Sequence, residues 1–151
     1  MARLLSPACL LALALQAPSA GAVECAVDIS GGDSLSYSRA SIAVPRACEA
    51  FTIRFAHRGI RPRETMGHNW VLSTLGHMQG VVDDGLIAGA QRHYLKPDDE
   101  RVLASSRMLG GGESEELRFD TGRLRPDEVY VFFCTFPGHA SRAKGLIRLI
   151  D

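Results

Sequence analysis

The sequence has no excess of charge of either sign, since its 151 residues include 17 Lys and Arg against 17 Asp and Glu. This balance excludes a surface that binds nucleic acid or an anionic membrane through bulk charge. Internal repeats, low-complexity tracts and long linkers are also missing, and the hydrophobic content of 46% is too high for a disordered chain. A chain of this length fits one domain with a sizeable core.

No apolar run is long enough to insert into a membrane. The longest one lies near the N terminus, between Leu4 and Leu15, and a spanning helix needs about 20 residues. Arg3 precedes this run, and small residues fill positions 18–22, where a signal peptidase would cut. We therefore expect residues 1–22 to be a cleaved export signal, with a disordered tail or a buried helix as the alternatives. Its removal takes away one Arg and no acid, leaving 16 basic against 17 acidic residues.

Cysteine is scarce, with four residues in the chain. Cys9 lies in the proposed signal and would leave with it. Cys25 and Cys48 flank a plausible hairpin and would be free to pair in an oxidising compartment. Cys134 is then left over, and an odd cysteine in an exported protein indicates a reactive thiol, a metal ligand or an intermolecular bond.

Short β-type segments follow one another from residue 23 to residue 151, separated by turn signals. Phe51–Phe55 alternates apolar and polar residues, so three apolar side chains share one face. Residues 129–133 are rich in strong β-formers and predict a buried strand. Other expected strands are 27–29, 42–44, 69–72, 101–104, 116–119 and 145–150, with one short helix inside 84–94. About eight short strands predict an all-β, Greek-key β-sandwich or barrel in a single domain, 23–151.

The richest chemistry lies in Cys134–His139, which reads Cys-Thr-Phe-Pro-Gly-His. A thiol ends a buried strand, and a Pro-Gly turn then presents an imidazole five residues later. His68 offers a second imidazole at the start of another strand. One thiolate and two imidazoles in a trigonal array suit a copper ion that changes oxidation state. The spacing alone also allows zinc, a thiol nucleophile with its base, or a merely buried cysteine.

Five segments of the sequence match a known family. They are Glu24-Cys25, residues 66–74 (MGHNWVLST), 78–82 (MQGVV), 94–99 (YLKPDD) and 132–139 (FFCTFPGH). With these segments the chain resembles the azurins, cupredoxins that carry electrons on a blue type 1 copper in the bacterial periplasm. The family can be laid over the mature chain without a gap, and it is cupredoxin-like in fold.

The resemblance implies a periplasmic one-electron carrier, without substrate turnover, that holds one copper cycling between Cu(II) and Cu(I). It assigns His68, Cys134 and His139 as equatorial copper ligands and the carbonyl of Gly67 as a weak axial ligand. Its partners would be redox proteins, either cytochromes or copper and haem reductases, which dock transiently at the His139 face.

The resemblance also assigns roles around the metal. Cys25–Cys48 would form the family disulfide, and Asn69 would tie the ligand loops together by side-chain hydrogen bonds. The backbone N–H of Phe136 would point at the ligand sulfur, in the manner of outer groups that tune a metal. His57 would lie near the site, either as a redox-coupled or as a structural histidine, and Trp70 would be a buried core residue.

The sequence departs from the family at two positions. Ala143 stands where the family has its axial Met, four residues after the second histidine. We expect a dry three-ligand site, with water in the vacated space as the alternative. Arg142 interrupts the apolar docking patch, whose other members are Met66, Leu86, Phe136, Pro137 and Ala140, and it predicts a partner with an acidic rim. Two other functions remain open, a copper buffer or delivery protein and a thiol enzyme using Cys134 and His139.

Overall fold

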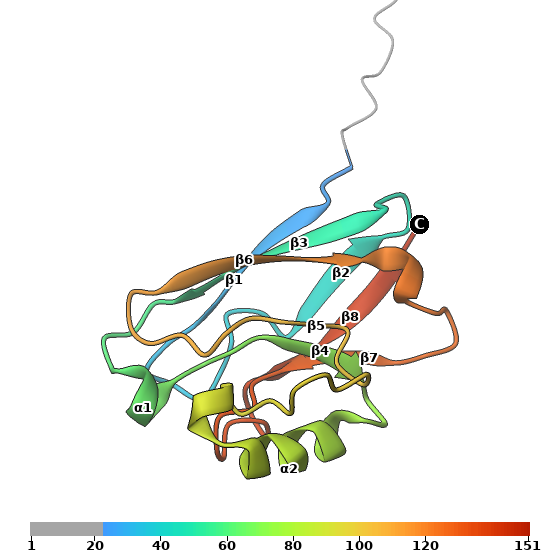
Figure 1. Cartoon of the computed structure of the whole chain (residues 1–151). Coiled ribbons are helices and arrows are strands. Elements are labelled where there is room, and N and C mark those ends of the chain that lie inside the picture. The colour runs from blue at the N-terminus through green and yellow to red at the C-terminus, as the bar shows by residue number, and fades with distance from the viewer. Residues whose placement is uncertain (1–22) are drawn as a thin grey trace, which may run out of the picture.

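Two β-sheets pack against each other in the computed structural model of the protein, which describes residues 23–151 (Figure 1). The smaller sheet has the strand order β1-β3-β6 and the larger one β2-β8-β7-β4-β5. The strands are β1 Ala26–Gly31, β2 Ser41–Pro45, β3 Ala50–His57, β4 Val71–Thr74, β5 Ala104–Ser105, β6 Ser114–Asp120, β7 Tyr130–Phe133 and β8 Lys144–Ile150. The all-β prediction is confirmed, while the proposed export signal and Cys9 lie outside the described residues.

The register of the larger sheet decides where the functional loops emerge. Val71 of β4 and Lys144 of β8 both pair with Phe133 of β7, one on each side. The chain before β4, the chain after β7 and the chain before β8 therefore lie at the same end of the sheet. At the other end, Pro45 of β2 pairs with Ile150 of β8.

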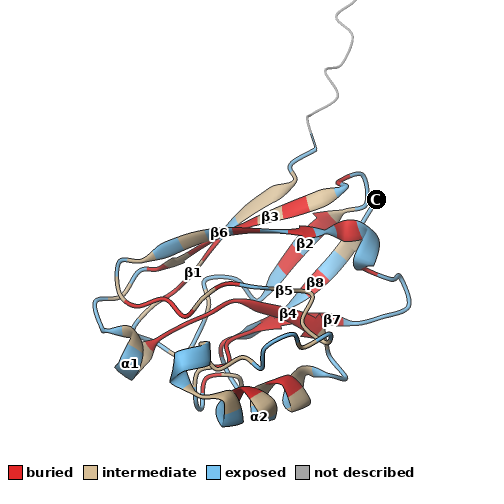
Figure 2. Ribbon diagram, in the orientation of Figure 1, coloured by how far each residue is buried: buried red, intermediate tan, exposed pale blue. Residues whose placement is uncertain are grey.

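Strand β7 is buried at all four positions because both of its faces are covered. Tyr130 and Phe132 belong to the main core between the sheets. Val131 and Phe133 point to the opposite face, where they pack with Val81 of helix α2, Met78–Ala88. Alternate residues of a strand point to opposite faces, so this strand joins two apolar clusters, and Figure 2 shows it as a continuous buried segment.

The helical segments lie outside the sandwich (Figure 1). Besides α2 they are α1 Arg63–Met66 and the short 3-10 turns η1 Ala90–Arg92 and η2 Thr121–Arg123. The helix predicted within 84–94 is confirmed in part, since α2 includes residues 84–88 but starts six residues earlier, at Met78. Within residues 23–151, no helix combines the length and the apolar character needed to cross a membrane.

Cys25 and Cys48 form a disulfide, with their Cα atoms 5.6 Å apart. The bond joins the residue before β1 to the turn before β3, as expected. The plausible hairpin between the two cysteines is wrong, because β1 pairs in parallel with β3 and β2 pairs with β8 in the other sheet. The chain between the cysteines thus crosses from one sheet to the other, and the disulfide closes this crossover.

Candidate metal centre

Cys134 follows β7 directly and continues its alternation. Because Tyr130 and Phe132 face the space between the sheets, the next even-numbered side chain also turns inward. The residue is completely buried and is the cysteine among residues 23–151 that lacks a disulfide partner. Its backbone N–H donates to the carbonyl of Ala143 at 2.9 Å, which fixes the start of the ligand loop against the start of β8.

A tight turn brings His139 back beside Cys134. The N–H of His139 donates to the carbonyl of Phe136 at 3.0 Å. Gly138, inside this turn, has a φ of 81°, a conformation that glycine adopts without the steric cost of a side chain. The carbonyl of His139 then accepts from the N–H of Ala143 at 2.8 Å, so the backbone of the loop is anchored at both ends.

His68 is held by both its backbone and its ring. Its N–H and carbonyl pair with Leu109 at 3.0 and 2.8 Å. Its ring Nε2 lies 2.9 Å from the carbonyl of Gly32 and 3.1 Å from that of Ser34. Two acceptors at Nε2 place the proton there, so Nδ1 keeps its lone pair. This Nδ1 is buried and has no hydrogen-bond partner within the protein, as expected of an atom that ligates a metal.

The three predicted ligands come together in one cluster. The ligand atoms of His68, Cys134 and His139 all lie within 4.8 Å of one another, and all three residues are buried. The Cys134 Sγ lies 3.6 Å from the Nδ1 of His139 and 3.9 Å from the carbonyl oxygen of Gly67. One soft sulfur, two imidazole nitrogens and a more distant carbonyl form a donor set that fits copper.

Burial keeps every donor in this cluster neutral. Desolvation raises the pKa of the Cys134 thiol to about 12, against weaker opposing hydrogen bonds. Burial also lowers the pKa of His139 to about 4, and the neighbouring His68 and His57 add to this effect. The pKa of His68 is lowered too, again mainly by burial. At neutral pH the imidazole lone pairs are therefore available, and binding a metal requires the loss of a single proton, from the thiol.

Asn69 links the two ligand loops, as the resemblance implied. Its side-chain Nδ2 donates to the Thr135 hydroxyl at 2.8 Å and to the carbonyl of His93 at 3.2 Å. Its Oδ1 accepts from the N–H of Thr135 at 2.9 Å. The amide thus holds the residue after His68 against the residue after Cys134, so the two loops are positioned together.

The remaining histidines differ in their surroundings. His57 is buried, with its ring centre 5.4 Å from that of His68, and its Nε2 donates to the carbonyl of Met66 at 2.8 Å. His57 therefore lies beside the site, as expected. His77 is exposed, and His93 is partly exposed and contributes only its carbonyl, to Asn69. Trp70 is fully buried between Phe119 and Phe132, as predicted.

Sequence reasoning missed the loop after β1 as part of the site. Gly32 and Ser34 supply the carbonyl groups that orient His68, and Tyr37 packs its ring on the same histidine, with centroids 6.1 Å apart. Backbone carbonyls leave no trace in a sequence, because any residue provides one. Tyr37 is the single aromatic residue within the mostly polar segment 33–39, and this was the signal that could have pointed to it.

Ala143 is completely buried and carries no donor atom. Its N–H bonds to His139 and its carbonyl to Cys134, so its backbone lies between two of the ligand residues. Position 143 is therefore held next to two of the three predicted ligands by its backbone, and its side chain offers them no donor.

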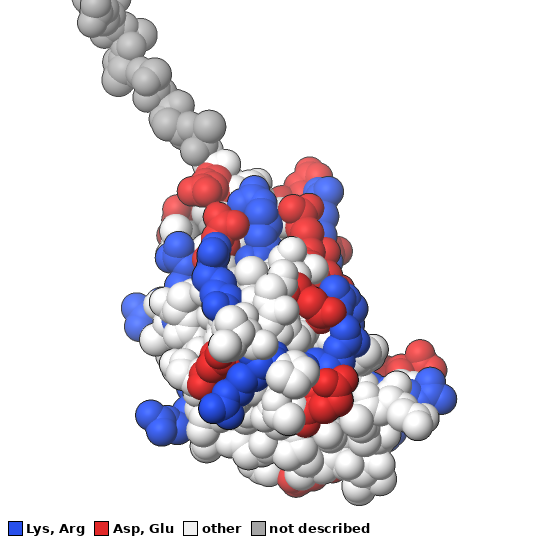
Figure 3. Space-filling view, turned by 90° about the vertical axis from the view of Figure 1, so that its left-hand side faces the viewer, with Lys and Arg blue, Asp and Glu red and all other residues white. Residues whose placement is uncertain are grey.

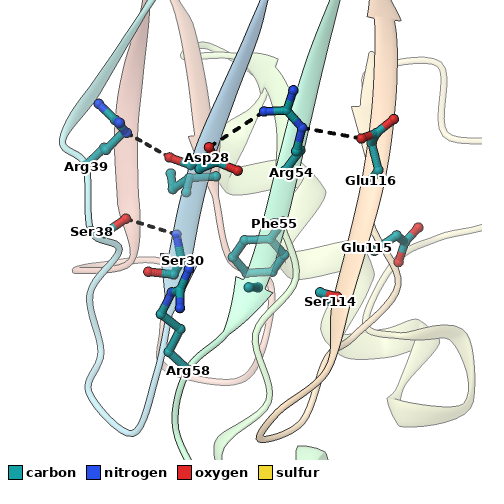
Figure 4. A pocket seen from close by; sticks show the side chains of 12 residues that line it. Asp28, Ser30, Ser38, Arg39, Arg54, Phe55, Arg58, Ser114, Glu115 and Glu116 are labelled. Atoms are coloured by element: carbon teal, nitrogen blue, oxygen red, sulfur yellow. Dashed lines mark hydrogen bonds and ion pairs between the residues drawn. The ribbon is translucent and has the colours of Figure 1, made fainter.

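A surface hollow lies away from this cluster, on the outer face of β1, β3 and β6 (Figure 4). Arg54 bridges Asp28 and Glu116 there, at 3.6 and 3.5 Å. These side chains are exposed, and surface ion pairs of this kind contribute little stability. The chemistry of the molecule is thus concentrated at the buried cluster rather than in the hollow.

A buried thiol with two neutral imidazoles defines the protein as one with a thiolate–imidazole metal centre. The chain belongs to the plastocyanin/azurin family of copper binding proteins, whose family pattern matches residues 23–149. It is 47% identical to the azurin of Pseudomonas aeruginosa over 149 residues, which covers 99% of both chains. Identity to the azurin of Bordetella pertussis is 46% over 130 residues, or 86% of this chain and 87% of that one.

The fold matches as well. The structure of an azurin from Methylomonas sp. strain J superposes with a TM-score of 0.82 at 39% identity, covering 85% of this chain and all of that one. Copper is therefore the cofactor of this protein, and its fold is that of a cupredoxin.

Proposed function

We propose that the protein is a periplasmic one-electron carrier and that it turns over no substrate. The observation that carries this proposal is the buried cluster of His68, Cys134 and His139, whose donor set suits both Cu(II) and Cu(I). Bound at these residues, copper would accept and release one electron. The export signal at 1–22 and the copper domain at 23–151 are part of the same proposal, and N-terminal sequencing of the exported protein tests the boundary between them.

In this proposal His68, Cys134 and His139 are the equatorial ligands and the Gly67 carbonyl is the weak axial one. Hydrogen bonds within the chain hold these donors in place. Leu109, Gly32 and Ser34 orient His68, while the turn at Gly138 and the amide of Asn69 orient the other loop. A site whose donors are already fixed needs little movement when the charge of the metal changes, and this favours rapid electron transfer.

The position of Ala143 gives the site its individual character. With a methyl group in place of a sulfur, the centre is a three-ligand site that favours Cu(I) and has a raised reduction potential. Burial supports a dry site, since Ala143 and its backbone partner Cys134 are both fully buried. Titration of the copper-loaded protein with azide or imidazole tests this, because spectral changes at low ligand concentration would show an open position.

Electrons would enter and leave through His139. This histidine is 3% exposed, whereas His68 and Cys134 are both 0% exposed. On the face shown in Figure 3, charged residues of both signs crowd the upper part, and the lower end of the molecule is mostly uncharged. Such an end suits brief contacts with a redox protein, a cytochrome or a copper or haem reductase. Arg142 is exposed and would face acidic groups of that partner.

The environment of Cys134 argues against a thiol enzyme. A nucleophilic cysteine has a lowered pKa and is partly accessible. Cys134 is fully buried and burial raises its pKa to about 12. Activity that survived copper removal and was lost on alkylation would contradict this argument.

A copper buffer or delivery protein is the second candidate function, and the loss of the axial donor at Ala143 favours it. The two functions differ in electron self-exchange, the transfer between oxidised and reduced copies of the protein. A carrier exchanges electrons quickly and keeps its copper, while a delivery protein exchanges slowly and passes copper to an acceptor such as a chelating peptide. We expect rapid exchange, measured by NMR line broadening in mixtures of the two redox states.

A further inference from the structure

The loop after β1 holds the ring of His68 through two backbone carbonyls, and the residue between them is Asp33. Gly32 and Ser34 provide these carbonyls, which lie 2.9 and 3.1 Å from the Nε2 of His68. Whatever fixes this short stretch of backbone therefore also fixes the direction in which the ring presents its other nitrogen, Nδ1, to the cluster.

The Asp33 carboxylate ties this loop to the segment after β3. Its Oδ2 accepts from the N–H of Ile60 at 3.0 Å, and its Oδ1 accepts from the N–H of Arg61 at 3.1 Å. The two segments are in close contact, since a side chain at Gly59 would collide with this carboxylate. The N–H groups of Ile60 and Arg61 hold the pKa of Asp33 below its usual value. The carboxylate is thus ionised at neutral pH, and hydrogen bonds to an ionised acceptor are stronger than those to a neutral one.

The middle of the loop, residues 32–36, depends on this carboxylate. Within the part of the chain that the structure describes, the hydrogen bonds from residues 32–36 to other segments go either to His68 or through the side chain of Asp33. The flanking residues Gly31 and Tyr37 are bonded elsewhere. Without the carboxylate, the two carbonyls would be hydrogen-bonded only to the ring that they orient, and ring and loop could turn together.

We propose that Asp33 is a positioning residue of the copper centre, which acts through the carbonyls of Gly32 and Ser34 on the ring of His68. An imidazole binds a metal through a lone pair in the plane of its ring, so a ring that turns directs this lone pair away from the metal. The partners of the second ring nitrogen commonly fix the orientation of a metal-ligating histidine. The inference rests on the proposed copper site and adds a residue to it.

The test compares Asp33→Ala with Asp120→Ala in the copper-free protein. Asp120 is a matched control because it is also exposed and its Oδ1 accepts from a backbone N–H, that of Gly122 at 2.7 Å, at the disulfide end of the sandwich. NMR measures two rates of hydrogen exchange with water, that of the His68 Nε2–H and that of the backbone N–H groups of β7. The second rate reports the stability of the whole fold. Competition with a chelator then measures the Cu(II) affinity of each variant.

For Asp33→Ala we expect the His68 Nε2–H to exchange about tenfold faster than in the parent, while the β7 groups change by less than about threefold. The Cu(II) affinity should fall about tenfold, the lower end of the effect of losing an outer partner of a metal ligand. Asp33→Asn keeps one acceptor oxygen, so its Nε2–H exchange should fall between those of the parent and Asp33→Ala. Asp120→Ala should leave both the Nε2–H exchange and the copper affinity unchanged.

Two results would overturn the inference. One is an Asp33→Ala protein whose His68 Nε2–H exchanges as in the parent, because the carbonyls would then be fixed without the carboxylate. The other is an equal acceleration of the Nε2–H and the β7 groups, since Asp33 would then act only on the stability of the whole fold. Failure of the copper-site proposal is separate, because the exchange rates come from the copper-free protein and do not depend on which metal the parent binds.

Discussion

The two sulfur sites of the molecule lie at opposite ends of the same sandwich and use cysteine in opposite ways. Cys25–Cys48 joins the crossover between the sheets, at the end where Pro45 pairs with Ile150. Cys134 lies at the other end, after Phe133, where β4, β7 and β8 meet. Cys25 and Cys48 form a covalent bond, whereas Cys134 is a buried thiol beside two imidazoles.

The disulfide end of the sandwich therefore contributes stability, and the Cys134 end provides the metal-binding chemistry. The disulfide limits the unfolded chain and touches no donor of the cluster. Cys134 contributes little as a cross-link, because it bonds to nothing, but without it the cluster has no thiolate. Substitutions at the Cys134 end should therefore change spectra and metal binding, and those at the disulfide end should change the free energy of unfolding.

The largest effect is expected for Cys134→Ser. Removing the thiolate should abolish the intense visible band and lower the Cu(II) affinity by more than about 100-fold, because even the loss of an outer partner of a metal ligand costs 10–100-fold. Competition with a copper chelator measures the affinity. If Cys134→Ser retained the band, another sulfur would have to bind the copper, and Cys134 would not be the ligand.

The paired substitution Cys25→Ser with Cys48→Ser should change the free energy of unfolding and leave the copper spectra as they are. The sequence separation of 23 residues predicts a loss of about 3 kcal/mol in the free energy of unfolding. Denaturant unfolding of the copper-free protein measures this loss. The visible and EPR spectra should stay those of the parent, and a changed spectrum would show that the two ends are coupled.

Asn69→Ala should affect both quantities, because this side chain joins two loops and makes three hydrogen bonds. Unpaired buried partners should cost about 1–3 kcal/mol of unfolding free energy, and copper affinity should fall about tenfold. Calorimetric copper titration at a temperature where the variant is folded separates the two effects. Normal affinity in a destabilised variant would restrict Asn69 to a structural role.

The pH dependence of stability should differ between the copper-free and the copper-loaded protein. The pKa of His139 is lowered in the folded state to about 4, below its ordinary value of 6.5. The unfolded chain then binds more protons between these pH values, so the copper-free protein should lose stability as pH falls from about 6.5 to about 4. With copper on the histidines the same window should be flatter. Equal slopes in thermal melts of both forms would contradict this expectation.

Arg142→Leu should have the smallest effect, limited to encounters with a partner. Arg142 is exposed, and a rim charge alters association rates more than affinity. The dependence of the electron-transfer rate on salt concentration should weaken, while the spectra stay unchanged. Lys144→Leu is a matched control, since it removes another exposed positive charge from the start of β8. An unchanged salt slope for Arg142→Leu would argue against an acidic rim on the partner.

The sequence was sufficient to predict most strands, because alternation within a strand is a local property. It placed the start of the helix too late, because the glycines of this segment weaken the helical pattern. Gly85 in fact lies inside α2, where a side chain would meet the carbonyl of Tyr94. The strand expected at 101–104 is reduced to β5, because Arg101 bonds to Asp84 and Asp99 and belongs to a turn.

The ligands of the site were predictable because their side-chain chemistry is specific, and the family resemblance supplied their roles. The groups that orient these ligands were harder to predict. Nothing local connects His68 with the carbonyl groups of Gly32 and Ser34, because the fold brings the loop after β1 to the segment before β4. Tyr37 was missed for the same reason, since its hydroxyl bonds to the carbonyl of Asn69 and its ring packs near His68, and both residues are distant in sequence.

Titration of the copper-free protein with Cu(II), followed by visible and EPR spectroscopy, tests directly whether His68, Cys134 and His139 hold a type 1 copper. One copper per chain should bind, with an intense thiolate-to-copper band, narrow copper hyperfine coupling and the release of one proton from Cys134 at neutral pH. A colourless protein that binds zinc in preference to copper at His68, Cys134 and His139 would contradict it.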